Sequence, residues 1–258
     1  MTNKTKNILV VRVPGVNGLG NTGGAAEAAE KIAEALGVKT KEIELTRDNV
    51  EEQEKETYEG AKEYLNKKEK VVFLGGDHSI SYNTCRAFEE IYSKENCFLI
   101  VFDAHVDLMP SMMEPTHEEW LRALIDNGFW RAENIVIVGA RDIDEIEREF
   151  IEERGIAVIG VDDFVKREKE IIEELKNKLN GKELYVSFDI DVYDKEIIEA
   201  TGYPVAQGFG KDALDNILEQ LSRLKELKAF DFVELHYGKK GFERGLEISK
   251  NVLGRFIN

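Results

Sequence analysis

The chain has few of the residues that mark a disulfide framework or a flexible linker. Only two cysteines, Cys85 and Cys97, and four prolines occur among its 258 residues. Two isolated thiols make neither a disulfide framework nor a cysteine-rich zinc site, so we expect both to be buried or inert. No Pro/Ser-rich linker or low-complexity stretch interrupts the chain, and its length suffices for one substantial core. We therefore predict a single domain over residues 1–258.

Long apolar runs and an excess of basic residues are absent as well. The amino-terminal segment MTNKTKNILVVRV holds an apolar stretch too short for a signal peptide or a membrane span, which predicts a cytoplasmic protein with no membrane partner. Only 35 Lys and Arg stand against 51 Asp and Glu, a formal net charge of −16. Because nucleic acid binding requires a basic surface, we predict no nucleic acid partner and expect a small cationic ligand.

Short apolar runs alternate with helix-like patterns along the whole chain. We predict strands over residues 8–13, 38–45, 71–74, 98–102, 135–138, 157–161, 184–188 and 229–234. We predict helices over residues 24–36, 51–66, 81–92, 118–127, 145–154, 168–179, 211–224 and 242–256. This alternation is typical of a parallel sheet covered by helices on both faces. The predicted fold class is α/β, a three-layer α/β/α arrangement with a mostly parallel sheet of about eight strands.

Six side chains suited to metal binding follow three of the apolar runs, in VVFLGGDHS (71–79), FLIVFDAHVD (98–107) and ELYVSFDIDVYD (183–194). They are His78, Asp103, His105, Asp107, Asp189 and Asp191. A strand alternates faces with period two, so the residues at 103, 105 and 107 are expected to share one face, as are those at 189 and 191. In open parallel sheets, ligands bind beyond the carboxyl ends of the strands, where all three groups fall. Carboxylates with a minority of imidazoles favour a divalent ion such as manganese over structural zinc.

A glycine-rich segment, VPGVNGLGNTGG (13–24), follows the first strand and precedes a helix, as a dinucleotide-binding loop does. Gly18, Gly20 and Gly23 match the G-x-G-x-x-G spacing, but the acidic residue expected about 20 positions later is poorly defined. We interpret the segment as a flexible loop at the rim of the site, and nucleotide binding is the weaker alternative.

The motifs GGDHS (75–79), DAHVD (103–107) and SFDIDVYD (187–194) resemble the signature motifs of the ureohydrolase family, which contains arginases, agmatinases and formimidoylglutamases. IVIVGARD (135–142) resembles the segment between the family's second and third motifs, and FVEL (232–235) resembles its last strand. The resemblance covers residues 71–235 well and the first 70 residues loosely. It implies an arginase-like fold and hydrolysis of a guanidino compound to urea and an amine.

The resemblance also implies two manganese ions, and it assigns ligands by position. One ion would be held by His78, Asp103, Asp107 and Asp189. The other would be held by Asp103, His105, Asp189 and Asp191, so that the carboxylates of residues 103 and 189 bridge. Aspartates that end parallel strands also occur in magnesium and phosphotransfer sites, but the two histidines disfavour that reading.

Three catalytic roles are implied by the same resemblance. Asp107 would pass a proton to the leaving amine, and Glu234 would pair with the guanidinium group. His117 lies in the loop after the second motif and is implied as a proton shuttle; its alternative is a helix-terminal residue without chemistry. Trimers and hexamers are common in the family, so we expect a homo-oligomer.

The loop between the second motif and His117, LMPSMMEPTH, is short, as in agmatinases. Its Met109, Met112, Met113 and Glu114 suggest an apolar and acidic lining for a methylene chain that ends in a cation, which favours agmatine over arginine or formimidoylglutamate. The chain departs from the family after residues 194 and 234. A catalytically weak member with a regulatory or assembly role therefore stays open. Retention of all four aspartates disfavours a one-zinc, deacetylase-like enzyme.

Overall fold

Eight parallel strands form one sheet, in the order β2-β1-β3-β8-β7-β4-β5-β6, in the computed structural model, which describes residues 8–18, 20–46, 48–68 and 70–257. The strands are β1 (Ile8–Val13), β2 (Thr40–Glu42), β3 (Lys70–Gly75), β4 (Cys97–Phe102), β5 (Ile135–Val138), β6 (Ala157–Ile159), β7 (Glu183–Asp189) and β8 (Leu227–Val233). Every pairing between neighbours is parallel. The predicted sheet is confirmed.

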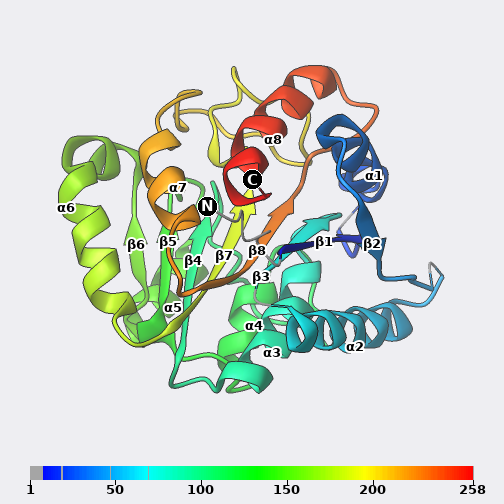
Figure 1. Ribbon diagram of the computed structural model, residues 1–258. Helices are drawn as coiled ribbons and strands as arrows, with labels where there is room; N and C mark the ends of the chain where they lie inside the picture. Colours follow the sequence, from blue (N-terminus) through cyan, green and yellow to red (C-terminus); the bar gives the residue numbers. More distant parts are fainter. Residues whose placement is uncertain (1–7, 19, 47, 69, 258) are drawn as a thin grey trace, which may run out of the picture.

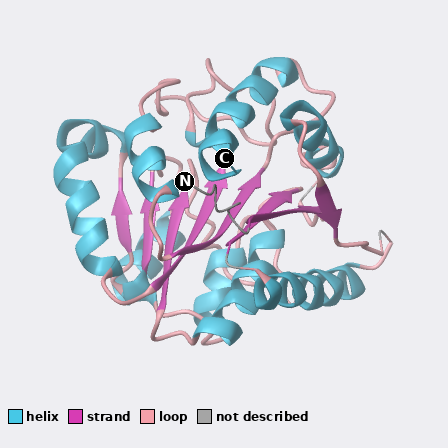
Figure 2. Ribbon diagram, in the orientation of Figure 1, coloured by secondary structure: helices cyan, strands magenta, loops and turns pink. Residues whose placement is uncertain are grey.

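Helices cover both faces of the sheet, which forms the central layer in Figures 1 and 2. One face packs against α1 (Ala25–Leu36), α6 (Val161–Leu179), α7 (Asp215–Ser222) and α8 (Phe242–Ile257). The other packs against α2 (Val50–Lys67), α3 (Ile80–Tyr92), α4 (Trp120–Asp126) and α5 (Glu145–Arg154). In β4, Phe98 and Ile100 face the first helix layer while Leu99 and Val101 face the second, as strand alternation requires. The three-layer α/β/α prediction is confirmed.

The two strands in the middle of the sheet are anchored by stacked aromatic rings. Phe188 of β7 lies parallel to Phe232 of β8, with ring centroids 5.7 Å apart, and both side chains are fully buried. Burial of one such side chain contributes about 1.5–3 kcal/mol to the free energy of unfolding. Residues that follow these rings in sequence, Asp189 and Glu234, are thereby held at the carboxyl edge of the sheet.

Some element boundaries differ from the prediction. The second strand has three residues instead of eight, and α6 begins at Val161 instead of residue 168. The early turns of α6 are helical because Phe164 packs into the core between the sheet and the helix layer that contains α6. A kink at Arg167 separates these turns from the predicted helix over residues 168–179. Both cysteines are free and buried, as expected.

No helix in the described ranges has the length and apolarity needed to cross a bilayer. Residues 1–7 of the amino-terminal segment and Leu19 of the glycine-rich segment lie outside the described residues. The cytoplasmic location and the single domain over residues 1–258 stay predictions.

Candidate metal centre and active site

Three strands, β3, β7 and β4, bring the predicted ligands to one edge of the sheet, and β8 lies between β3 and β7. His78 lies in the turn between β3 and α3, and Asp103 follows β4 directly. Asp189 is the last residue of β7, and Asp191 lies in a 3-10 turn (Ile190–Val192). Because β3, β8, β7 and β4 are neighbours in the sheet, segments more than 100 residues apart in sequence meet at this point.

Most of the predicted ligands lie in loops after the strands, so strand alternation does not bring them together. β4 ends at Phe102, so residues 103–107 form a loop, and β7 ends at Asp189. The loop is shaped by its own carboxylate, because Asp103 Oδ1 accepts a hydrogen bond from the backbone N–H of His105 at 2.7 Å. Asp189 Oδ1 accepts from the N–H of Asp191 at 2.7 Å in the same way. The prediction of a shared strand face was therefore wrong, because side chain to backbone bonds replace the strand.

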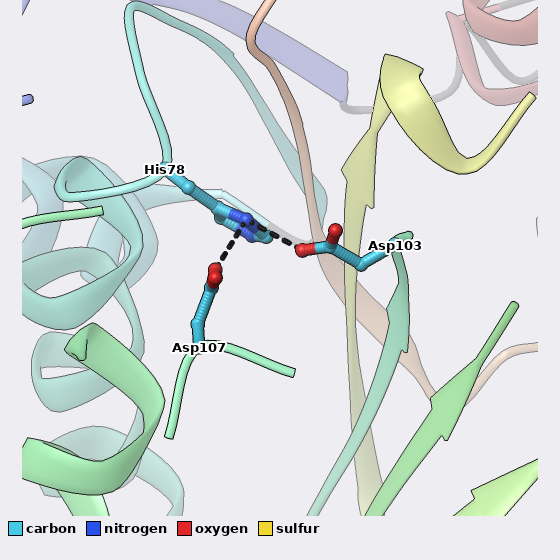
Figure 3. A group of neighbouring side chains, drawn as sticks. All are labelled: His78, Asp103 and Asp107. Atoms are coloured by element: carbon cyan, nitrogen blue, oxygen red, sulfur yellow. Dashed lines mark ion pairs between the residues drawn. The ribbon is translucent and has the colours of Figure 1, made fainter. Parts of the chain in front are cut away.

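One carboxylate lies between the two imidazoles. Asp103 Oδ2 is 2.9 Å from Nδ1 of His78, and its Oδ1 is 3.5 Å from Nδ1 of His105. Asp107 also approaches His78 Nδ1, at 3.1 Å (Figure 3). Asp189 approaches the same nitrogen at 3.5 Å. Two groups of possible ligands result, and Asp103 belongs to both.

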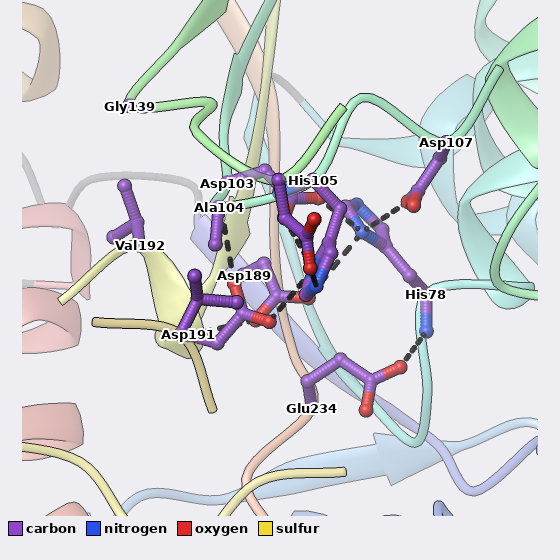
Figure 4. Close-up of polar contacts among 12 residues, drawn as sticks. His78, Asp103, Ala104, His105, Asp107, Gly139, Asp189, Asp191, Val192 and Glu234 are labelled. Carbon is purple, nitrogen blue, oxygen red and sulfur yellow. Dashed lines mark hydrogen bonds and ion pairs between the residues drawn. The ribbon is translucent and has the colours of Figure 1, made fainter. Parts of the chain in front are cut away.

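The second group completes the cluster in Figure 4. His105 Nδ1 lies 3.0 Å from Asp191 Oδ2, and Asp191 Oδ1 accepts from the N–H of Ala104 at 3.1 Å. Gly139, after β5, lies close to Val192, and a Cβ at residue 139 would be only 2.6 Å from Val192 Cγ2. Its φ of +103° is a conformation that glycine adopts readily and residues with a side chain rarely do. All six predicted metal ligands thus lie in one contiguous cluster.

A buried hydrogen-bond chain sets the orientation of His78. Its Nε2 lies 2.8 Å from Ser187 Oγ, and Ser187 donates its proton to Asp231 Oδ1 at 2.7 Å. The Ser187 oxygen therefore accepts from Nε2–H, which leaves the lone pair on Nδ1 in the neutral ring. Nδ1 is buried and has no hydrogen bond of acceptable geometry to any described residue, although three carboxylates surround it. An imidazole tied at one nitrogen and open at the other fits a metal ligand.

Charge in the cluster is also balanced poorly by protein groups alone. Burial, followed by the negative charge of Asp103, raises the pKa of Asp107 to about 7. Burial and the charge of Asp191 raise the pKa of Asp189 well above its usual value. For His78, burial lowers the pKa, but the surrounding carboxylates raise it by more. The carboxylates thus favour a positive charge at the open Nδ1 of His78, which a proton or a divalent ion can supply, so the donor set fits divalent ions.

Asp107 and Glu234 are held from several sides. Trp120 Nε1 donates to Asp107 Oδ2 at 2.6 Å, and the Trp120 ring lies 4.6 Å from that of His78. Glu234 follows β8 and its Oε1 accepts from the backbone N–H of His78 at 2.8 Å. Burial and the charge of Asp77 raise the pKa of Glu234 well above its usual value.

A cavity of about 270 Å³ opens above this cluster. Five of the six predicted ligands line it, together with Glu234 and His117; Asp103 lies beneath them. Its other lining residues are Met109, Glu118, Asp142, Asp144, Glu147 and Tyr203. The lining contains four further carboxylates and no lysine or arginine among the described residues.

The predicted methionine and Glu114 lining was partly wrong. Met109 does line the cavity, but Met112 is 60% and Met113 90% exposed, and neither borders the cavity, nor does Glu114. The acidic wall instead comes from Glu118 and from the segment after β5, which sequence analysis missed. The strand that precedes residues 142 and 144 was predicted, so the rule that ligands bind at strand carboxyl ends could have identified both.

His117 lies in the turn before α4, buried and facing the cavity. Neither ring nitrogen has a hydrogen-bond partner among the described residues, and its ring stacks on Tyr203. Burial, followed by the charges of His78 and His105, lowers the pKa of His117 to about 4. The imidazole of His117 therefore lies at the cavity wall in its neutral form, and its role as a proton shuttle stays a prediction.

The glycine-rich segment packs against Asp77, the neighbour of His78, and none of its described residues lines the cavity. Its flexibility and its place at the rim of the site stay predictions. Asn17 N–H and Thr22 Oγ1 both donate to Asp77 Oδ2, at 3.0 and 2.9 Å. A Cβ on Gly76 would collide with the carbonyl oxygen of Gly15, so the close approach requires glycine. Because a protein carboxylate accepts these donors, they are not free to cradle a phosphate, which disfavours the nucleotide-binding alternative.

Comparison with known proteins agrees with this geometry. The model of the arginase family matches residues 19–237. The chain belongs to the arginase family. The match begins well within the first 70 residues, where the sequence resemblance was loose.

The relatives of this arginase-family chain differ in their substrates. It is 29% identical over 167 residues to an N(1)-aminopropylagmatine ureohydrolase of Thermus thermophilus, covering 64% of this chain and 54% of that protein. It is 29% identical over 196 residues to an arginase of Schizosaccharomyces pombe, covering 67% of this chain and 58% of that protein. The chain spans about half the length of these curated relatives. A formimidoylglutamase of Bacillus subtilis shares the fold with a TM-score of 0.84 at 18% identity, over 100% of this chain and 89% of that one.

Proposed function

We propose that the protein is a binuclear manganese hydrolase that cleaves a guanidino compound, agmatine in preference to others, to urea and an amine. The observation that carries the proposal is Asp103, whose two carboxylate oxygens face two different imidazoles. His78, Asp107 and Asp189 surround one position, and His105 and Asp191 the other. When bound, two divalent ions would supply a nucleophilic water at neutral pH.

The chain's own residues would bind the substrate and move protons. Glu234 lines the cavity beside His78 and would accept two hydrogen bonds from a guanidinium group. Asp107 also lines the cavity and would carry a proton to the leaving amine. His117, on the outer wall, would exchange that proton with solvent.

Agmatine is favoured because of the charges around the cavity. Glu118, Asp142 and Asp144 border it, and no lysine or arginine does so among the described residues. A terminal ammonium group would be attracted to these carboxylates, whereas the α-carboxylate of arginine would be repelled without a cationic partner. The relative from Thermus thermophilus, whose name states an agmatine derivative, supports the same substrate class.

The test is a kinetic comparison of the manganese-loaded protein. Urea release would be measured for agmatine, N(1)-aminopropylagmatine, arginine and guanidinobutyrate, and formamide release for formimidoylglutamate. We expect kcat/KM for agmatine or its aminopropyl derivative to exceed that for arginine by roughly tenfold or more. Arginine as the best substrate would contradict the argument from the cavity wall, and no release from any compound would favour the regulatory or assembly role.

A matched variant separates binding of the guanidinium group from metal binding. Glu234→Gln keeps the size of the side chain but removes the charge that pairs with guanidinium, so kcat/KM for the best substrate should fall by about 100-fold. Its metal content should equal that of the wild-type protein. Unchanged kinetics would remove Glu234 from the substrate site. The trimer or hexamer stays a prediction that sedimentation equilibrium can check.

A further inference from the structure

We propose that Tyr203 is a positioning residue that holds the imidazole of His117 in a fixed orientation at the cavity wall. The inference rests on the hydrolase activity proposed above, and it assigns a role to a residue outside the predicted site. The two rings are stacked, with centroids 5.2 Å apart and an interplanar angle of 20°. Both side chains line the cavity.

The side chain of His117 lacks polar contacts that would fix its orientation. It is 7% exposed, and neither nitrogen has a hydrogen-bond partner among the residues that the structure describes. The nearest carboxylate oxygen, Glu118 Oε1, is 3.9 Å from Nε2, beyond hydrogen-bond distance. The backbone before His117 is anchored, because Asn17 donates to the carbonyl of Pro115 and Glu119 accepts from the N–H of Thr116. After it, the carbonyl of Glu118 accepts from the N–H of Met109 at 3.2 Å. Only packing therefore determines the plane of the ring, and Tyr203 supplies its parallel face.

The loop that carries Tyr203 is clamped on both sides of the residue. Lys239 Nζ donates to the carbonyls of Thr201 and Gly202, at 2.8 and 3.1 Å. Arg141 donates to the carbonyls of Val205 and Ala206, at 3.1 and 2.9 Å. Two cationic side chains thus hold the backbone just before and just after the tyrosine.

The orientation matters because proton transfer depends on it. Proton transfer through an imidazole requires a ring nitrogen within hydrogen-bond reach of the proton donor and of the acceptor. A ring without hydrogen bonds would rotate about its side-chain bonds once the stacked partner is removed. Since a misplacement of about 1 Å can lower a rate about 100-fold, the stack is expected to affect turnover and not metal binding.

A double-mutant cycle tests the coupling of the two residues. In the manganese-loaded protein, His117→Asn should lower kcat by about 100-fold, within the usual range for a proton-transfer group. Tyr203→Ala should lower kcat by about tenfold, and Tyr203→Phe, which keeps the ring, should stay within about twofold of wild type. In the His117→Asn background, Tyr203→Ala should change kcat by less than about twofold. Equal losses in both backgrounds, or a Tyr203→Phe variant as slow as Tyr203→Ala, would overturn the proposal.

A second measurement does not depend on activity. The chain has four histidines, so ring-proton NMR signals can be assigned by single His→Asn variants. In the metal-free protein, where no paramagnetic Mn²⁺ broadens nearby signals, the signal of His117 should be shifted upfield by the Tyr203 ring. Tyr203→Ala should remove the shift while Tyr203→Phe keeps it. Tyr237→Ala is the control, because Tyr237 is 46% exposed and lies outside the cavity. An unshifted His117 signal in the wild type would overturn the stack, whereas a wild type that cleaves no guanidine would refute only the proposed function.

Discussion

Ser187→Ala should lower the affinity for the divalent ion bound at His78 more than the affinity for the ion bound at His105. Ser187 Oγ is the hydrogen-bond partner of His78 Nε2 and passes its own proton to Asp231. Because His78 is 1% exposed, bulk water cannot take the place of the missing hydroxyl. The ring would then lose the interaction that keeps its proton on Nε2 and its lone pair on Nδ1.

The size of the effect follows from that one bond. Leaving a buried N–H without an acceptor costs about 1–3 kcal/mol. Since about 1.4 kcal/mol is tenfold in an equilibrium constant, the affinity should fall by roughly 10- to 100-fold, which is also usual for loss of an outer partner of a ligating histidine. Titration calorimetry of metal-free protein with Mn²⁺, supported by competition with a chelator, would measure both ions.

Ser81→Ala is a matched control. The Ser81 hydroxyl donates to Asp231 Oδ2 at 2.8 Å and makes no hydrogen bond with the His78 ring, and the backbone bond from the Ser81 N–H to the His78 carbonyl stays in the variant. Loss of this hydroxyl should therefore change the affinity by a much smaller factor. Two results would refute the reasoning: a Ser187→Ala variant that binds both ions as the wild type does, or one that loses affinity equally for both ions. An equal loss for both ions would mean that the substitution lowers affinity by disturbing the fold and not by changing the orientation of His78.

Two further predictions concern the shared carboxylate and the pH dependence of stability. Asp103→Asn keeps an acceptor for the N–H of His105 but removes the charge between the two imidazoles, so elemental analysis should find that both ions are lost; a variant that retains two would exclude bridging. For Glu54, burial and then the charge of Glu114 raise the pKa to about 7, while Arg86 and Asn83 lower it and Glu51 raises it. A raised carboxyl pKa means that the folded state binds the proton more tightly than the unfolded state, so stability is lost as the pH rises towards about 7. Glu54→Gln should therefore raise Tm relative to the wild type above about pH 8 and leave Tm unchanged near pH 4.5. The same difference in Tm between variant and wild type at both pH values would contradict this assignment.

Much of the fold and of the cluster could be predicted because strong local patterns carry them. Strands such as β4, with six buried apolar residues, are recognisable without a partner, and their carboxyl ends must meet at one edge of a parallel sheet. The bends after β4 and β7 could not be predicted from alternation. They depend on Asp103 and Asp189 accepting hydrogen bonds from the backbone two residues later, a contact that competes with the strand.

The residues of the cavity wall were missed for a different reason. Asp142 and Asp144 are single acidic residues in a chain with 51 Asp and Glu, so composition gives them no prominence. Only the sheet order, which places β5 next to β4, brings their segment over the cluster. Conversely, Met113 belongs to a segment that lies beside the site in sequence, yet it projects into solvent.

Backbone strain marks two of the residues to which we assign guanidine chemistry. Asp107 has a φ of 51° and Glu234 a φ of 70°, in the left-handed region that residues with a side chain avoid. Such a conformation costs about 1–3 kcal/mol and persists only where the surrounding structure enforces it. Here the backbone N–H of Glu234 donates to Gly76 at 2.9 Å, and the carbonyl of Asp107 accepts from Arg122 at 3.3 Å. Glycine would relieve the strain at either position but would remove the carboxylate. The strain is therefore best explained by a requirement for a carboxylate at these two points of the cavity.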